Sequence, residues 1–206
     1  MKEMYNNYKK ELSKKNNLVI LIIVIFLIGI TFGSIYITIL SNSQKSNIIS
    51  QIALYFKSMN KISIDDKIDI FKNSLYSNLL YTIFMWVLGL SVIGLPIVFI
   101  MIFFKSFILG FSVSSIFAKY GINGLLRAIL YIFPSNIIFM LFIIFLSTYS
   151  VLISNKIFFS AIKKQSINFN TFMGKYFFIL VIGILISILC SLYEAFVNPY
   201  IYQIIF

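Results

Sequence analysis

An uninterrupted apolar run from Leu18 to Leu40 is the feature that most limits what this chain can fold into. It contains no charged residue, and an α-helix of that length reaches about 35 Å. Such a helix crosses a hydrocarbon core about 30 Å thick with some tilt. Because 60% of the 206 residues are hydrophobic and further runs follow, no room is left for a sizeable soluble domain. We therefore expect an integral membrane protein.

The basic residues before this run look like the start of a secretion signal. A signal peptide, however, has an apolar run of only about 7–15 residues and then small residues at a cleavage site. Residues 18–40 form a longer run, and the polar sequence at 41–44 offers no cleavage pattern. We interpret residues 1–17 as a basic cytoplasmic N-terminus and residues 18–40 as an uncleaved first transmembrane helix.

A polar stretch at 41–71 follows, and its apolar residues recur at helical spacing. Ser63, with Asp66 three positions further on, fits the start of a helix, because acidic residues are favoured in a first turn. Amphipathic helices here would lie on the membrane surface or hold a partner. A solvated hairpin between two spans fits the sequence equally well. The apolar residues that we assign to a partner surface are Tyr55, Phe56, Met59 and Phe71.

The next apolar stretch, 79–104, is long enough for one span, but Gly94 and Pro96 interrupt it. Proline lacks a backbone donor and disfavours the helical conformation for the residue before it. A sharp turn at this point divides the stretch between two transmembrane helices, which we predict at 72–92 and 96–118.

The distribution of lysines favours this division. With five spans, the N-terminus and the basic loop at 156–175 lie on the same side of the membrane, and with four they lie on opposite sides. Cytoplasmic loops carry an excess of Lys and Arg, which favours five spans, although the 41–71 loop holds lysines too. We therefore expect a cytoplasmic N-terminus and an extracytoplasmic 41–71 loop.

Glycines and prolines also divide the rest of the chain. Residues 121–133 are too short to span and end at Pro134, so we expect a re-entrant or interfacial helix that packs against the bundle. Transmembrane helices are predicted at 135–155 and 176–197, with a short tail at 198–206. The expected fold class is all-α, a single polytopic membrane bundle of about five transmembrane helices.

Three charged residues lie in or beside apolar runs, namely Lys105, Arg127 and Glu194. Charges are unfavourable in lipid, usually face the interior of a bundle, and are candidates for function. Lys105 lies about 13 Å beyond Pro96 along a helix, which is near the middle of a membrane. We predict that Glu194 pairs with Arg127 or, failing that, with Lys105. A structural ion pair, a transport role and exposure at the interface are all compatible with the sequence.

Residue types that carry catalysis are scarce. The chain has no histidine and a single cysteine, Cys190, so it has neither a histidine base nor an internal disulfide. The aspartates at 65–69 are explained by a helix start, and no phosphate-binding glycine loop occurs. We expect no enzyme activity, cofactor or metal site. The net charge of +11 comes from residues between apolar runs, so the expected partner is the lipid bilayer and not nucleic acid.

Small residues mark faces where helices can approach closely. Gly29 and Gly33 form a G-x-x-x-G pattern in the first span, and Gly89 and Gly110 offer similar space in later ones. Such faces favour helix association, so packing inside the bundle and a homo-oligomer are both compatible with them.

Two stretches together resemble one family. Residues 84–96 (FMWVLGLSVIGLP) and residues 105–111 (KSFILGF) resemble stage II sporulation protein M of endospore-forming bacteria. The small size, the basic N-terminus and the start of the fourth span look similar as well. The resemblance singles out as structural candidates Trp86, Gly94, Pro96, Lys105, Pro134 and Asn136.

This resemblance implies a scaffold. Proteins of the family lie in the mother-cell membrane at the sporulation septum and recruit stage II sporulation proteins P and D, which hydrolyse peptidoglycan during septal thinning and engulfment. A channel, transporter or lipid-handling protein is the alternative, using the break at Gly94–Pro96 and the intramembrane charges. A continuous polar cavity that reaches Lys105 and Glu194 would favour the alternative. A dry, closed bundle with an exposed amphipathic loop would favour the scaffold.

Overall fold

The computed structural model describes residues 2–59, 62–163 and 169–205. Side chains are described for all residues except 1–14, 58–61, 125–133, 161, 163–172 and 202–206. Within the described residues the chain is helical and contains no strand. The elements are α1 (Lys2–Ile39), α2 (Asn42–Met59), α3 (Ile64–Gly89), α4 (Gly94–Lys163), α5 (Phe169–Leu192), the π-helical turn η1 (Tyr193–Val197) and α6 (Asn198–Ile205).

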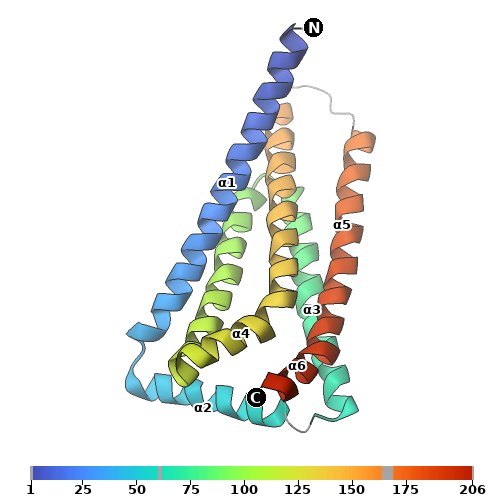
Figure 1. Ribbon diagram of the computed structural model, residues 1–206. Helices are drawn as coiled ribbons and strands as arrows, with labels where there is room; N and C mark the ends of the chain where they lie inside the picture. The colour runs from blue at the N-terminus through green and yellow to red at the C-terminus, as the bar shows by residue number, and fades with distance from the viewer. Residues whose placement is uncertain (1, 60–61, 164–168, 206) are drawn as a thin grey trace.

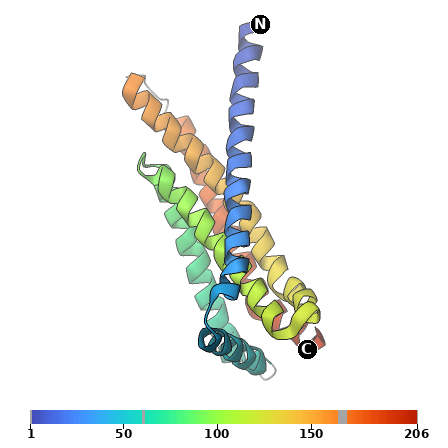
Figure 2. The same ribbon diagram turned by 90° about the vertical axis from the view of Figure 1, so that its left-hand side faces the viewer.

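The long helices run side by side as a bundle, and α2 lies across one end of it (Figures 1 and 2). We call this end the α2 end. The C-terminus and α6 also lie there, whereas α1 starts at the opposite end. The final turns of α4 lie at the same end as the start of α1 (Figure 1). The start of α1 and the end of α4 are therefore separated by an even number of crossings. The five-span prediction requires this, because it has four spans before the 156–175 loop and one after it.

Four segments of the described chain are long and apolar enough to cross a membrane: Lys15–Ile39, Gly94–Gly124, Pro134–Ser160 and Met173–Ile201. Large apolar side chains on their outer faces are exposed, as lipid contact requires; Ile39 is an example. The prediction of a helical membrane bundle is thus confirmed. Helix α3 runs between the same two ends (Figures 1 and 2) but is more polar, so a fifth span stays a prediction.

Helix α3 begins at a capping box. The Ser63 hydroxyl accepts a hydrogen bond from the Asp66 backbone N–H at 3.1 Å, and the Ser63 N–H donates to the Asp66 carboxylate at 2.9 Å. Each residue thereby satisfies a backbone donor that a helix start leaves free. The predicted helix start at Ser63 is confirmed.

The apolar stretch 79–104 is divided between two helices, because α3 ends at Gly89 and α4 begins at Gly94. The turn lies slightly before the position that the sequence predicts. A side chain at Gly94 would collide with the backbone carbonyl of Leu88, so the turn is closed by a residue without one. Pro96 lies in the first turn of α4, where its missing N–H has no helical partner to lose.

Helix α4 changes direction twice. At Gly121 the backbone has φ 64° and ψ −151°, a conformation essentially restricted to glycine. The chain then runs across the α2 end and bends again near Pro134 before it returns along the bundle (Figure 1). The segment predicted at 121–133 as a re-entrant or interfacial helix is helical, is set off from the preceding helix by the kink at Gly121, and continues through Pro134 into the rest of α4. Its re-entrant or interfacial position stays a prediction.

The chain after Glu194 stays helical, whereas the sequence predicts a tail from 198 onwards. Proline at 199 has no N–H, and the π-helical turn before it shifts the bonding so that the Asn198 N–H donates to the carbonyl of Tyr193. Proline is tolerated in the first turn of a helix, so α6 continues beyond it.

Helices α1 and α4 pack closely against each other at glycine residues. A side chain at Gly29 would collide with Ser106, and one at Gly110 would collide with the backbone of Ile30. Gly33 likewise packs directly against the α4 backbone. The G-x-x-x-G pattern is thus used inside the bundle, where it lets the two helices approach closely. Whether copies of the chain associate stays a prediction.

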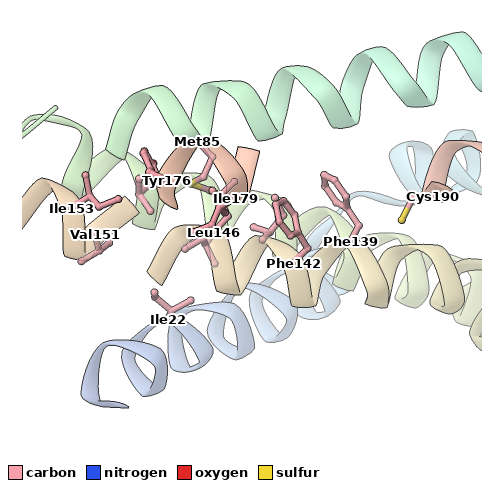
Figure 3. Packing of buried hydrophobic residues seen from close by; sticks show 13 residues of the cluster. Ile22, Met85, Phe139, Phe142, Leu146, Val151, Ile153, Tyr176, Ile179 and Cys190 are labelled. Carbon is pink, nitrogen blue, oxygen red and sulfur yellow. The ribbon is translucent and has the colours of Figure 1, made fainter. Parts of the chain in front are cut away.

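The main apolar core lies between α1, α3, α4 and α5 (Figure 3). It extends from Ile153 and Tyr176 at one side of the view in Figure 3 to Phe139 and Cys190 at the other. Met85 and Leu146 at its centre have no exposed surface. This packed region closes the bundle on one side of the site described next.

Candidate functional site

A cavity of about 560 Å³ lies at the α2 end of the bundle, between α2, α3, two parts of α4 (before Gly121 and after Pro134), η1 and α6. No residue of α1 lines it, nor any of residues 79–104. Along α3 it extends from Ile70 to Asn78, which is about 12 Å. We call it the α2-end cavity. Its polar inner surface is formed by Ser74, Asn78, Lys105, Asn136, Glu194 and Asn198.

Lys105 is the single basic residue among those that line the cavity. Its Nζ lies 5.1 Å from the ring centroid of Phe139 and 5.4 Å from that of Tyr81, so two aromatic faces stabilise the charge. These contacts leave the N–H groups of the ammonium without a protein acceptor among the described residues. The charge is therefore held in place and is available to an anionic group in the cavity.

Glu194 is the acidic residue of the cavity wall and lies on η1. The Ser74 hydroxyl donates a hydrogen bond to its carboxylate, and the amide of Asn78 donates to Ser74 and Ser191 at 3.4 Å each. Glu194 attracts the charge of Lys105 through space. In the described part of the chain, however, no salt bridge within 4.0 Å joins the two.

The predicted pairing of Glu194 with Arg127 stays a prediction, because the Arg127 side chain lies outside the described residues. The alternative pairing with Lys105 is found only as attraction across the cavity. Direct contact is absent because Ser74 and the aromatic rings hold the two charges apart.

Two further polar atoms of the cavity wall have no partner. The Ser115 hydroxyl and the side-chain carbonyl of Asn198 are buried and make no hydrogen bond among the described residues. Ser115 is 1% exposed and Asn198 is 6% exposed. Buried polar groups in proteins are nearly always hydrogen-bonded, so these two groups are available to a polar molecule in the cavity.

Phe56 corrects the predicted partner surface. Its side chain is 4% exposed and packs with Ile116 and with the ring of Tyr120, whose centroid is 6.0 Å away. It is therefore an internal contact that attaches α2 to α4, and is not an exposed anchor. The reason is helical geometry, because α2 turns one face towards the bundle and Phe56 lies on that face.

The other three residues of that predicted surface differ in exposure. Tyr55 is 48% exposed and Phe71 is half-buried. The Met59 side chain lies outside the described residues. Leu54, which sequence reasoning did not single out, is 66% exposed on the outer side of α2.

Trp86 lies far from the cavity and has a structural role. Its ring stacks on Tyr176 with centroids 5.1 Å apart and an interplanar angle of 17°. Gly94, Pro96 and Pro134 also lie outside the cavity wall, at the turn and the bend of the backbone. Asn136, in contrast, lines the cavity.

A polar seam between α3 and α5 was missed from sequence. Asn78 and Thr82 on α3 face Ser191 and Ser187, and the Thr82 and Ser187 hydroxyls lie 3.3 Å apart. The signal that could have found it is the four-residue spacing of Ser74, Asn78 and Thr82 on one helix face. Such polar contacts join membrane helices, and they explain why α3 is less apolar than its neighbours.

The described residues contain no group of three or more His, Cys, Asp or Glu side chains able to hold a metal ion. The bundle and the cavity define a polytopic helical membrane protein with a polar pocket at one end. The family model for stage II sporulation protein M matches residues 22–199, and the chain belongs to this family. It is therefore a sporulation-related membrane protein, of a family not known as enzymatic. Neither a curated protein nor a solved structure matches the chain.

Proposed function

We propose that the chain is a non-enzymatic scaffold in the mother-cell membrane at the sporulation septum, with its N-terminus in the cytoplasm. It recruits the peptidoglycan hydrolases stage II sporulation proteins P and D for septal thinning and engulfment. The observation that carries the proposal is the family match over residues 22–199. A scaffold needs firm anchoring, which the apolar segments supply, and a surface on the side where the hydrolases act.

The surface that fits this role is the outer face of α2 together with the start of α3. Leu54 and Tyr55 are exposed on α2, and Ile64 is 75% exposed at the start of α3. Helix α2 is fixed to the bundle, because the Lys119 ammonium donates to the carbonyl of Ile49 at 3.1 Å and Phe56 packs beneath it. A rigid helix with exposed apolar side chains suits partner recognition.

The test is co-purification of the hydrolases from sporulating cells with the double variant Leu54→Ser/Ile64→Ser, whose two residues are exposed and lie outside the cavity wall. The matched control is Ser46→Ala/Ser50→Ala, which changes two exposed residues of α2 that bond only to their own helix. At equal membrane levels, we expect the first variant to lose most of the recovered hydrolase and the control to retain it. Equal recovery from both variants would refute this surface.

A channel or transporter is the second candidate, and the α2-end cavity with Lys105 and Glu194 is the observation that favours it. A passage would have to continue to the other end of the bundle. There the core around Met85 and Leu146 is fully buried and apolar. The cavity is thus closed at its inner end, which supports a binding pocket over a conduction path.

A further inference from the structure

The inner surface of the α2-end cavity carries hydrogen-bond donors and acceptors that no other described group of the protein satisfies. The N–H groups of the Lys105 ammonium have no acceptor among the described residues, and the side-chain carbonyl of Asn198 has no donor there. The Ser115 hydroxyl is unpartnered as well. Leaving such groups dry is unfavourable, and a bound molecule with both an anion and hydrogen-bond donors would satisfy them.

The two charges of the cavity define what that molecule must carry. Lys105 favours an anionic group, while Glu194, more than 4.0 Å from it, disfavours a second negative charge and favours a cation. A purely anionic ligand would be attracted by one residue and repelled by the other. A zwitterion satisfies both, because each of its charges meets the opposite charge of the wall.

The rest of the wall is mostly apolar, although Gln51, Ser77 and Ser112 also line it. Ile52, Leu109 and Phe111 line it, and a volume of about 560 Å³ is typical of pockets for small amphiphilic ligands. Ser77 on α3 and Ile108 on α4 also line the cavity and are exposed, Ile108 by 58%. Because Ile108 belongs to a membrane-crossing segment, this side of the cavity faces lipid tails.

We propose that the α2-end cavity binds a zwitterionic phospholipid whose head carries a phosphate and a primary ammonium, as in phosphatidylethanolamine. The phosphate lies at Lys105, and the ammonium donates hydrogen bonds to Glu194 and Asn198. The acyl chains leave between Ser77 and Ile108. The site goes beyond hydrolase recruitment, since its charged and unpartnered groups lie inside the bundle; Tyr55 borders both the cavity and the outer face of α2, whereas Leu54 does not line the cavity.

Native mass spectrometry of the full chain, purified in detergent, tests the proposal. The probes are phosphatidylethanolamine, phosphatidylglycerol and phosphatidylcholine with identical acyl chains, together with soluble phosphoethanolamine. We expect the first lipid to bind most tightly, because phosphatidylglycerol lacks the ammonium and phosphatidylcholine cannot donate hydrogen bonds from its head. Equal binding of the three lipids, preference for phosphatidylglycerol, or equal affinity for soluble phosphoethanolamine would overturn it.

Two variants with different effects on affinity and preference separate binding from misfolding. Lys105→Met removes the partner of the phosphate, so we expect affinity for phosphatidylethanolamine to fall by about tenfold or more. Glu194→Gln removes the partner of the ammonium and the repulsion of anions, so the preference over phosphatidylglycerol should shrink by roughly tenfold. A misfolded protein would lose affinity for both lipids, whereas Glu194→Gln should bind phosphatidylglycerol more tightly than the wild type does.

The matched control is Lys72→Met, which removes one exposed lysine of α3 outside the cavity wall. We expect it to bind the lipids as the wild type does. If Lys105→Met behaved like Lys72→Met, or Glu194→Gln left the preference unchanged, the proposed site would be wrong.

Discussion

The hydroxyl of Tyr176 donates a 2.8 Å hydrogen bond to the carbonyl of Trp86, and the indole of Trp86 donates a 3.0 Å bond back to the carbonyl of Tyr176. The two rings also stack. The Tyr176 hydroxyl lies 2.8 Å from that of Ser150, so the same contact reaches α4. Three helices are thereby joined at the end of the bundle opposite α2.

Replacing Tyr176 by Phe should destabilise the protein by about 1–3 kcal/mol, because it leaves the buried carbonyl of Trp86 without its donor. Unfolding in mixed detergent, followed by circular dichroism, measures this change. Tyr76→Phe is the control, since Tyr76 is 69% exposed on α3. Equal stability of the two variants would show that the hydrogen bonds of the Tyr176 hydroxyl contribute nothing measurable.

The close approach of α1 and α4 predicts a contrast between two identical substitutions. Gly110→Ala adds a methyl group against the backbone of Ile30, and overpacking of this kind destabilises by about 1–3 kcal/mol. Gly174→Ala meets nothing within 4 Å and should stabilise helix α5 by up to about 1 kcal/mol. The same unfolding measurement compares them, and effects of the same sign would contradict the packing described for Gly110.

The kink at Gly121 predicts a cost that arises within the local backbone and not from neighbouring side chains. A methyl group there meets open space, yet the backbone conformation is one that only glycine adopts easily. Gly121→Ala should therefore destabilise the fold by about 1–3 kcal/mol. Gly174→Ala again serves as the control, because its backbone φ is not positive. An unchanged stability for Gly121→Ala would mean that α4 relaxes to another path at no cost.

Much of the fold follows from the sequence, because membrane helices are specified by local composition. The first span, the helix start at Ser63 and the break before Pro96 depend on apolar length, capping and proline chemistry, all of which act over a few residues. The course of the chain after Gly121 is harder to predict from the sequence. A single glycine conformation determines it, and the sequence shows only that glycine is present there.

The candidate site shows the limit more clearly. The sequence singles out Lys105 and Glu194, because charges in apolar runs are rare. It does not show that Ser74 bonds Glu194 or that Asn198 and Ser115 border the same cavity, because those residues are far apart in the chain. The prediction that Phe56 is exposed is wrong for a similar reason, since an amphipathic pattern does not show which apolar residues another helix covers.

The capping box at the start of α3 predicts a dependence on pH. Hydrogen bonds from the Ser63 hydroxyl and from its backbone N–H lower the pKa of the exposed Asp66 carboxyl below its ordinary value. A group with a lowered folded-state pKa stabilises above its unfolded pKa, and the contribution is lost as pH falls through the folded value. The helix start should therefore weaken in acid and not in base.

Nuclear magnetic resonance titration of the Asp66 carboxyl in micelles measures this effect. Ser63→Ala removes the larger cause of the shift, so the midpoint should rise towards the ordinary value of about 3.9, while the remaining backbone bond keeps it slightly lower. Ser50→Ala, an exposed serine of α2 that bonds its own helix, should leave the midpoint unchanged. If the midpoint in Ser63→Ala equalled that of the wild type, the Ser63 hydroxyl would not be the group that holds the Asp66 carboxylate ionised.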